Sequence, residues 1–175
     1  VTGDFEKAIR ASSKVLAIRG RVIPSSLEKV TLVGEFTDGT AVEGETNITA
    51  QNKPLRRIRL KPVECGATPE ALEAIENADL IILGPGRLYT SILPNLLIRE
   101  IRDAILHSEA YKVFVINIMT QPGETDGFSA YDHLRVLIEH TDPRLVDVCV
   151  VNVSAIPSEM VEKYREKGAQ LAHLD

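Results

Sequence analysis

A glycine-rich turn at the end of an apolar stretch is the first place where this sequence could do chemistry. Residues 84–91 read Gly-Pro-Gly-Arg-Leu-Tyr-Thr-Ser and directly follow Leu-Ile-Ile-Leu. Glycines let the backbone turn sharply and approach a ligand, and hydroxyls with free amides at the start of a helix suit a phosphate. The candidate ligand-binding residues here are Gly84, Gly86, Arg87, Thr90 and Ser91. An ordinary strand-to-helix turn with a Thr or Ser cap explains the same residues about as well, because Gly-x-Gly alone is unspecific.

A second polar segment, residues 117–126, reads Asn-Ile-Met-Thr-Gln-Pro-Gly-Glu-Thr-Asp and also follows an apolar run. Glu124 and Asp126 could hold Mg²⁺, because carboxylate oxygens are the ligands that this cation prefers. Gln121 and Thr125, together with Thr120, could donate hydrogen bonds to sugar or phosphate oxygens. In the alternative interpretation Pro122-Gly123 is a plain turn and Asp126 or Ser129 caps the next helix. The density of polar groups favours a binding site.

The segments around these two loops alternate between helix and strand from residue 66 onward. Thr68-Pro69 starts a helix, and the later helices are expected from Thr90 or Ser91, through residues 131–138, and over 157–167. The expected strands are residues 80–83, 112–118 and 146–153, all apolar enough to be buried on both faces of a parallel sheet. This order predicts an α/β fold with a doubly wound, mainly parallel sheet flanked by helices. Ligands bind beyond the carboxyl ends of such strands, which is where both polar loops lie.

The first part of the chain has a different pattern. A short helix is expected from Asp4, a strand-like segment over 20–24, and strands over 29–36, 40–45 and 58–63. Asp38-Gly39 predicts a type I′ hairpin turn between the second and third of these. Together they form a small β-hairpin excursion, and residues 170–174 are expected to add one last strand.

The composition of the chain argues against two classes of partner, nucleic acids and membranes. The 175 residues carry a formal net charge of −5 and show no basic stripe, which argues against nucleic acid. No apolar run approaches the roughly 20 residues that a membrane span needs, and no signal peptide is apparent. The two cysteines form no CxxC pair, so no disulfide framework is implied and a reducing cytoplasm is the simplest location.

The sequence contains none of the common motifs for zinc binding or for covalent catalysis. The four histidines show no metal-ligand spacing such as HExxH, so no zinc is expected, and neither is haem or flavin. There is no Gly-x-Ser-x-Gly elbow and no Cys/His pair, which leaves the catalytic residues unknown. His133 lies on the helix that follows the polar loop and is the one histidine that we consider as a candidate for a site.

Two long segments closely resemble hallmarks of the YvcK branch of the CofD-like family. Residues 84–97 resemble that branch's Gly-Pro-Gly-Ser-Leu-Tyr-Thr-Ser-Ile-Leu-Pro-Asn segment, and residues 117–130 resemble its Met-Thr-Gln-Pro-Gly-Glu segment. Residues 20–24 and 44–48 also look like family landmarks. The resemblance covers nearly the whole chain. It implies a Rossmann-like fold, and it adds Asn95 and Tyr164 as candidate ligand-binding residues.

The resemblance implies two different activities within the family. CofD proper carries out a Mg²⁺-dependent transfer of a lactyl-phosphate group to a deazaflavin in coenzyme F420 synthesis. The YvcK branch is associated with UDP-sugar binding, gluconeogenic growth and cell shape. Mg²⁺ is therefore a candidate cofactor, with Glu124 and Asp126 as its ligands, and a UDP-sugar or another phosphate ester is the expected partner.

Two departures from the family pattern shape the expectation for this chain. Arg87 stands where the family usually has Ser. The family's N-terminal Gly-Gly-Gly-Thr-Gly loop and its Gly-His segment have no counterpart. We therefore expect residues 1–175 to be a single, N-terminally incomplete CofD-like domain that carries half a site. Within it, residues 19–63 would be the β-rich excursion and 64–175 the βα-repeat core.

Three functions remain open from the sequence. The first is a cytosolic UDP-sugar-binding regulator, the second is a CofD-like transferase whose Glu124 or Asp126 places Mg²⁺ between phosphate oxygens, and the third is an interaction domain without a ligand. The sequence Met-Thr-Gln-Pro-Gly-Glu at 119–124 resembles the YvcK branch, which favours the UDP-sugar-binding regulator over the transferase. Neither the sugar nor the oligomeric state follows from the sequence, and a homo-oligomer stays open.

Overall fold

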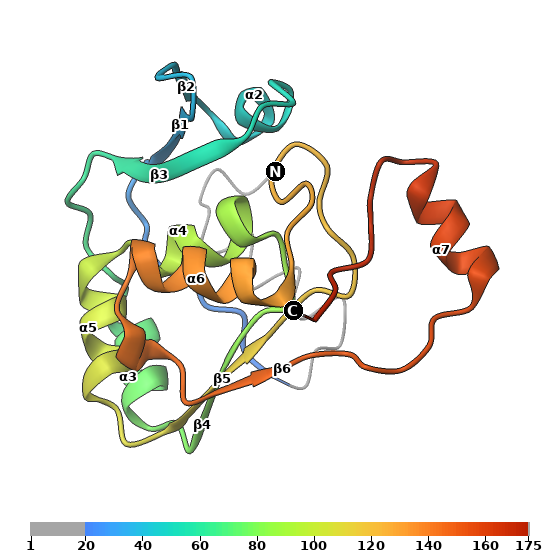
Figure 1. Ribbon diagram of the computed structural model, residues 1–175. Coiled ribbons are helices and arrows are strands. Elements are labelled where there is room, and N and C mark those ends of the chain that lie inside the picture. The colour runs from blue at the N-terminus through green and yellow to red at the C-terminus, as the bar shows by residue number, and fades with distance from the viewer. Residues whose placement is uncertain (1–19, 175) are drawn as a thin grey trace.

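The structure, a computed structural model, describes residues 20–174 of the chain and contains two three-stranded sheets with a layer of helices between them (Figure 1). The helix expected from Asp4 lies outside the described residues. A Rossmann-like α/β fold with a parallel sheet and an antiparallel excursion, as the sequence predicts, is confirmed.

The antiparallel sheet has the strand order β2-β1-β3 and is built from β1 (Thr31–Phe36), β2 (Ala41–Glu43) and β3 (Leu55–Lys61). The predicted hairpin between β1 and β2 is present, with Glu35 opposite Ala41. The type I′ assignment of its turn is wrong, because only Gly39 has a positive φ and the amide of Phe36 reaches past it to the carbonyl of Thr40. A longer turn with one left-handed glycine is the usual alternative to the two-residue turn.

The parallel sheet has the order β4-β5-β6, with β4 (Leu80–Leu83), β5 (Tyr111–Val115) and β6 (Val148–Val150). The connections are helical, as expected. α3 (Pro69–Glu76) precedes β4, and Thr68 caps it by accepting from the amide of Ala71. The crossover from β4 to β5 contains a π-helical turn (Leu88–Ile92), α4 (Leu93–Leu96) and α5 (Arg99–His107), and the crossover to β6 contains α6 (Ala130–His140) and a 3₁₀ turn (Pro143–Leu145).

Three local predictions fail in the described residues. Residues 20–24 form no strand, since the segment that leads into β1 has no ladder partner. The strand expected over 40–45 ends at Glu43, and a short helix that the sequence does not predict, α2 (Glu45–Thr49), begins where the strand was expected to end. Residues 170–174 contribute only one antiparallel bridge, between Leu171 and Met119. Each of these segments is short, and its conformation depends on its tertiary neighbours more than on local propensity.

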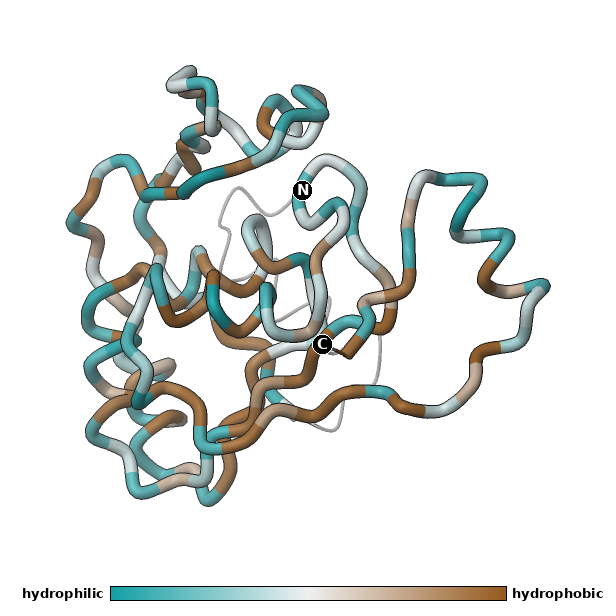
Figure 2. The backbone as a smooth tube through the Cα atoms, in the orientation of Figure 1, coloured by the Kyte–Doolittle hydropathy of each residue, from teal (hydrophilic) through white to brown (hydrophobic). Residues whose placement is uncertain are grey.

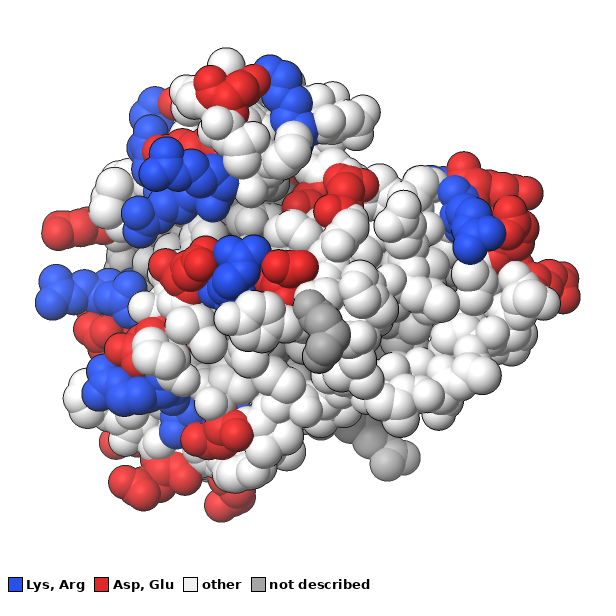
Figure 3. Space-filling view, viewed as in Figure 1, with Lys and Arg blue, Asp and Glu red and all other residues white. Residues whose placement is uncertain are grey.

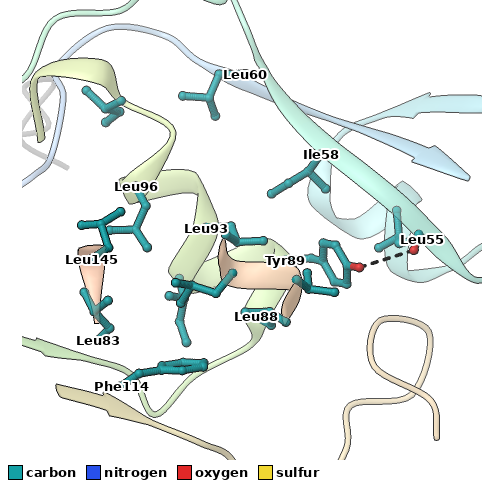
Figure 4. Packing of buried hydrophobic residues seen from close by; sticks show 14 of the residues in the cluster. Leu55, Ile58, Leu60, Leu83, Leu88, Tyr89, Leu93, Leu96, Phe114 and Leu145 are labelled. Carbon is teal, nitrogen blue, oxygen red and sulfur yellow. Dashed lines mark hydrogen bonds between the residues drawn. The ribbon is translucent and has the colours of Figure 1, made fainter. Parts of the chain in front are cut away.

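The hydrophobic core lies between the two sheets and within the helix layer. Figure 4 shows side chains of β3, including Ile58 and Leu60, packed over Leu93 and Leu96 of α4, with Phe114 of the parallel sheet on the other side. Tyr89 is buried in the same cluster, its hydroxyl donates to the carbonyl of Leu55 at 3.4 Å, and burial raises its pKa to about 12. The helix layer therefore holds the parallel sheet and the excursion together.

The apolar sequences of the parallel strands predict that these strands are buried on both faces. Within the described residues this prediction is wrong. Leu83 and Phe114 face the helices and are buried, but Leu80 and Ile82 are 51% and 55% exposed. Figure 2 shows these strands as a hydrophobic band on the side of the molecule away from the helix layer. The strands are apolar enough to be buried on both faces of the sheet, but the described residues cover only one of these faces.

The segment after β6 runs away from the body, forms α7 (Ser158–Arg165) and returns (Figure 1). The helix expected over 157–167 is thus confirmed, and Gly168 ends it with a φ of 84°. No side chain of α7 is buried. Among the described helices, none has the length and apolar character needed to cross a membrane.

Candidate functional site

The turn after β4 depends on Gly84, which has a φ of 86°. A Cβ at this position would lie 2.9 Å from the carbonyl oxygen of Val115, in the neighbouring strand β5. Both the left-handed backbone and the close approach exclude other residues without a shift of the main chain. The glycine thus brings the first loop directly against the carboxyl end of the second strand.

The helix that follows opens with a π-helical turn, earlier than the start at Thr90 or Ser91 that the sequence suggests. The amides of Ser91 and Ile92 both donate to the carbonyl of Arg87, at 2.9 and 3.0 Å. Thr90 is buried while Arg87 and Ser91 are exposed. Single π turns of this kind occur often at functional sites, because they direct a side chain that a regular helix would place elsewhere.

Asn117 joins the two candidate loops. Its side-chain oxygen accepts from the amide of Gly86 at 3.1 Å, and its side-chain nitrogen donates to the carbonyl of the same glycine at 2.7 Å. The side-chain amide of Asn117 therefore satisfies both backbone hydrogen-bonding groups of Gly86, as the backbone of an adjacent strand would. Asn117 was missing from the predicted ligand-binding residues, although an asparagine at the end of an apolar strand was the signal that could have found it.

Glu124 makes the second connection between the loops. Its Oε1 accepts from the hydroxyl of Thr90 at 2.8 Å and lies 3.4 Å from a guanidinium nitrogen of Arg87. The Glu124 side chain is fully buried, and among the described residues its Oε2 has no hydrogen-bond partner. The structure thus brings together Gly86, Arg87 and Thr90 of the first loop with Asn117 and Glu124 of the second.

Burial decides the electrostatics of Glu124. Desolvation raises the pKa of its carboxyl group, and the hydroxyl of Thr90, the charge of Arg87 and the amides of Thr90 and Tyr89 partly offset that rise. The carboxylate thus lies at the start of the helical turn, where backbone amides stabilise negative charge. A buried acid held by one hydroxyl and one half-exposed arginine is a common arrangement at binding sites, and also in structural ion pairs.

Several of the other polar side chains in the second loop accept hydrogen bonds from backbone amides of the same loop and so stabilise its turns. The hydroxyl of Thr125 accepts from the amide of Gln121 at 2.8 Å, and Asp126 accepts from the amide of Gly123 at 2.7 Å. Ser129, rather than Asp126, caps α6 in a reciprocal arrangement with Asp132. Thr125 is buried and Asp126 is exposed. The turn chemistry of the alternative interpretation is therefore present, in the same loop as the Glu124 connection.

The two residues added by resemblance lie in different places. Asn95 is exposed on α4, where its amide donates to the carbonyl of Ser91 at 2.7 Å and its oxygen accepts from Ser25 at 2.6 Å. It therefore borders the first loop. Tyr164 is 45% exposed on α7, beside Met160 and Lys163. No described hydrogen bond joins its side chain to either loop.

The polar loop is fixed from outside by the chain that returns from α7. The amide of Thr120 donates to the carbonyl of Gln170 at 2.7 Å, and the Thr120 hydroxyl accepts from the amide of the same residue at 2.9 Å. Gly123 has a φ of 79°, and a Cβ there would lie 2.6 Å from the carbonyl oxygen of Thr49 in α2. The loop is thus held between the excursion and the C-terminal segment.

The metal role predicted for Glu124 and Asp126 stays a prediction. The described residues contain no group of three His, Cys, Asp or Glu side chains that could hold a metal ion. Mg²⁺ often binds through one or two carboxylates together with phosphate oxygens and water. Asp126, with its exposed carboxylate, fits that mode better than Glu124, whose carboxylate is enclosed by Thr90 and the loop.

Comparison with known proteins places this geometry in a family. The model of the family described as 2-phospho-L-lactate transferase CofD matches residues 1–175. The chain belongs to the CofD family. The Gly84 turn and the loop at 117–126 are thus two loops of a CofD-family chain.

Three curated relatives are 42–47% identical to this chain over the residues that align with it. A relative from Aquifex aeolicus is 47% identical over 97% of this chain and 53% of its own length. The gluconeogenesis factors of Halalkalibacterium halodurans and Bacillus subtilis are 44% and 42% identical over 100% of this chain, which covers 54% and 55% of their lengths. The chain spans about half the length of the curated relatives it matches.

A solved structure supports the same fold. The crystal structure of a member of the UPF0052 family from Bacillus halodurans is similar to this chain with a TM-score of 0.93 and 44% sequence identity. The similarity covers 99% of this chain and 56% of that protein. The Rossmann-like arrangement predicted from the two hallmark segments is thereby confirmed.

Proposed function

We propose that this chain forms part of a UDP-sugar-binding site in a cytosolic regulatory protein of the YvcK type, linked to gluconeogenic growth and cell shape. The observation that carries the proposal is the direct connection of the two loops. Asn117 pairs with both backbone groups of Gly86, and Glu124 binds Thr90 beside Arg87. Both loops lie at the carboxyl ends of adjacent parallel strands, where α/β proteins bind their ligands.

The exposed groups around this connection suit a charged, oxygen-rich ligand. The Arg87 guanidinium is half exposed, so it can reach a phosphate while Glu124 holds its position from behind. Ser91 and Asn95 offer polar groups on the helical side, and Asp126 offers a carboxylate on the loop side. Asp126 would be the ligand for Mg²⁺ if the cation bridges to a diphosphate. The names of the Halalkalibacterium and Bacillus relatives support the link to gluconeogenesis.

The proposal is tested by the thermal stability of the protein with UDP-glucose and other UDP-sugars, with and without Mg²⁺. A ligand at 100 times its Kd stabilises the folded state by about 2.7 kcal/mol. We expect Arg87→Ala to reduce this stabilisation by at least half with little effect on the free protein. Arg144→Ala is the matched control, since Arg144 is an exposed arginine whose ion pair within the described residues is with Asp142. Equal stabilisation in both variants, or none in any UDP-sugar, contradicts the proposal.

A CofD-like transferase is the second candidate, favoured by the description of the family whose model matches the whole chain. In that case the same two loops would position the phosphate ester that is transferred, and Asp126 would help to hold Mg²⁺. Incubation with a labelled lactyl-phosphate donor and a deazaflavin acceptor distinguishes the two. Formation of product favours the transferase, and stabilisation by a UDP-sugar without product favours the regulator. A chain that does neither would be an interaction domain.

A further inference from the structure

The antiparallel sheet carries an excess of basic side chains on the side that faces away from the helix layer. Residues 46–63 contain five lysines and arginines and no acidic residue. The apolar residues of β3 point to the core, so the alternating Arg57, Arg59 and Lys61 point outward, about 7 Å apart along the strand. Figure 3 shows basic side chains gathered over β3. We call this group the basic face, and it consists of Lys53, Arg56, Arg57, Arg59 and Lys61.

Acidic side chains on the neighbouring strands neutralise only part of the basic face. The ion pairs are Glu35–Arg59, Glu43–Lys61 and Asp38–Lys53, at 3.0, 2.6 and 2.7 Å. Within residues 20–174, Arg56 and Arg57 form no ion pair, although both side chains are exposed. The basic face therefore keeps two positive charges that no described carboxylate compensates.

Acidic side chains gather around α3. Residues 62–86 contain five acidic residues and no basic one. Three of them lie three residues apart on α3, which makes them neighbours on the helix surface, and a fourth lies in the turn to β4. These four, which we call the acidic face, are all exposed, and they are Glu70, Glu73, Glu76 and Asp79. None of them forms an ion pair within the part of the chain that the structure describes.

The two faces lie at opposite ends of the molecule. In Figure 1 the antiparallel sheet forms one end and α3 lies toward the other, with α4 and α6 in the layer between them. The two faces therefore do not touch within one chain. They can meet when two copies associate, because each copy carries both. Contact between two basic faces, or between two acidic faces, is disfavoured by the repulsion of like charges.

We propose that the basic face of one copy, centred on Arg56 and Arg57, binds the acidic face on α3 of a second copy. This interface is head-to-tail, because each copy contributes a different surface, so the association closes into a ring or continues as a chain of copies. The carboxylates of Glu35, Asp38 and Glu43 within the basic face would repel a phosphate backbone, which favours an acidic protein surface over a nucleic acid as the partner.

The test is sedimentation velocity of the 175-residue chain over a range of concentrations, in about 20 mM and about 0.5 M NaCl, because salt screens attraction between exposed charges. We expect association in low salt and a monomer in high salt. Arg56→Ala/Arg57→Ala and Glu70→Gln/Glu73→Gln should each weaken the association by about tenfold. The control is Lys163→Ala/Arg165→Ala, which removes the same charge as the arginine variant, but from exposed positions on α7.

A mixture of the two double variants tests the head-to-tail geometry. Each variant keeps one intact face, so together they should form a 1:1 dimer that grows no further. A mixture that stays monomeric overturns the proposal. So does a wild-type chain that is monomeric in low salt, association that persists in high salt, or an equal loss in the α7 control. UDP-sugar binding enters none of these measurements, so its failure leaves the result unaffected.

Discussion

Glu124 combines the cost of burying a carboxyl group with a position between the two candidate loops. Its carboxyl group is buried, and desolvation raises its pKa above the ordinary value of 4.5. The folded state therefore holds its proton more tightly than the unfolded state, and this group's contribution to stability is lost as the pH rises above about 4.5 through the raised pKa. Glu124→Gln should remove that part of the pH dependence, so the variant should lose less stability than the wild type between pH 5 and pH 8.

The measurement is the free energy of unfolding by urea at both pH values, with Glu159→Gln as the control on the exposed face of α7. If the wild type and Glu124→Gln respond to pH equally, the carboxyl group is not desolvated as described. Reduced UDP-sugar binding in the same variant would connect the buried charge to the position of Arg87.

Asn117 is the residue on which the connection of the loops most depends. Asn117→Ala leaves the amide and carbonyl of Gly86 without these partners, and each unpaired polar group that stays buried costs about 1–3 kcal/mol. We expect a loss of stability of about 2 kcal/mol together with weaker ligand binding. Asn152→Ala is the matched control, since Asn152 follows the neighbouring strand β6 and, among residues 20–174, its side chain hydrogen-bonds Ser154 alone. Similar losses in both variants would show that Asn117 is an ordinary turn residue.

At the scale of the elements, His140 joins α6 to the antiparallel sheet. Its Nδ1 lies 2.7 Å from the carbonyl of Val136, which can only accept, so this nitrogen carries the proton. Its Nε2 then accepts from the amide of Ile58 in β3 at 3.2 Å. Protonation of Nε2 would break that bond. Burial lowers the pKa of His140, as it does for His133, so their contribution to stability is complete above pH 6.5 and is lost as the pH falls through the lowered pKa.

His140→Ala should therefore destabilise the protein by about 2–4 kcal/mol, because it leaves a buried amide unpaired and a cavity in the core. It should also speed hydrogen exchange at the amide of Ile58. His107→Ala is the control, as His107 is exposed and the hydrogen bond described for its ring is to the carbonyl of Asp103 in its own helix. Unchanged exchange at Ile58 would mean that the excursion is held by side-chain packing alone.

The elements also show what local sequence can and cannot predict. Helices with a clear cap and apolar stripe, such as α3 and α6, were predicted from Thr68 and from residues 131–138. The type of the turn after Phe36 and the helix α2 were not, since their conformations depend on the register of β1 against β3 and on contacts with the polar loop. The π-helical turn at Leu88–Ile92 has no sequence signature of its own.

At the scale of the whole molecule, the prediction that two loops converge at one sheet edge followed from strand order alone, because parallel strands end on the same side. The partners within that edge did not follow. The hydrophobic periodicity of the sequence does not show that Asn117 hydrogen-bonds Gly86. It also does not show that Asp126 stabilises a turn by accepting from the amide of Gly123, while the side chain of Glu124 is buried. Nor does it show which face of an apolar strand stays open, since Leu80 and Ile82 are as hydrophobic as their buried neighbour Leu83.

The most direct test of the account is a titration of the isotope-labelled protein with UDP-glucose, followed by the amide NMR signals of Gly84, Gly86 and Gly123. These glycines report on the turn after β4 and on the polar loop after β5. We predict that the signals of both loops shift together along one binding curve, and that Asn117→Ala weakens both responses equally. A response confined to one loop, or two curves with different midpoints, would contradict a single site formed by the two loops.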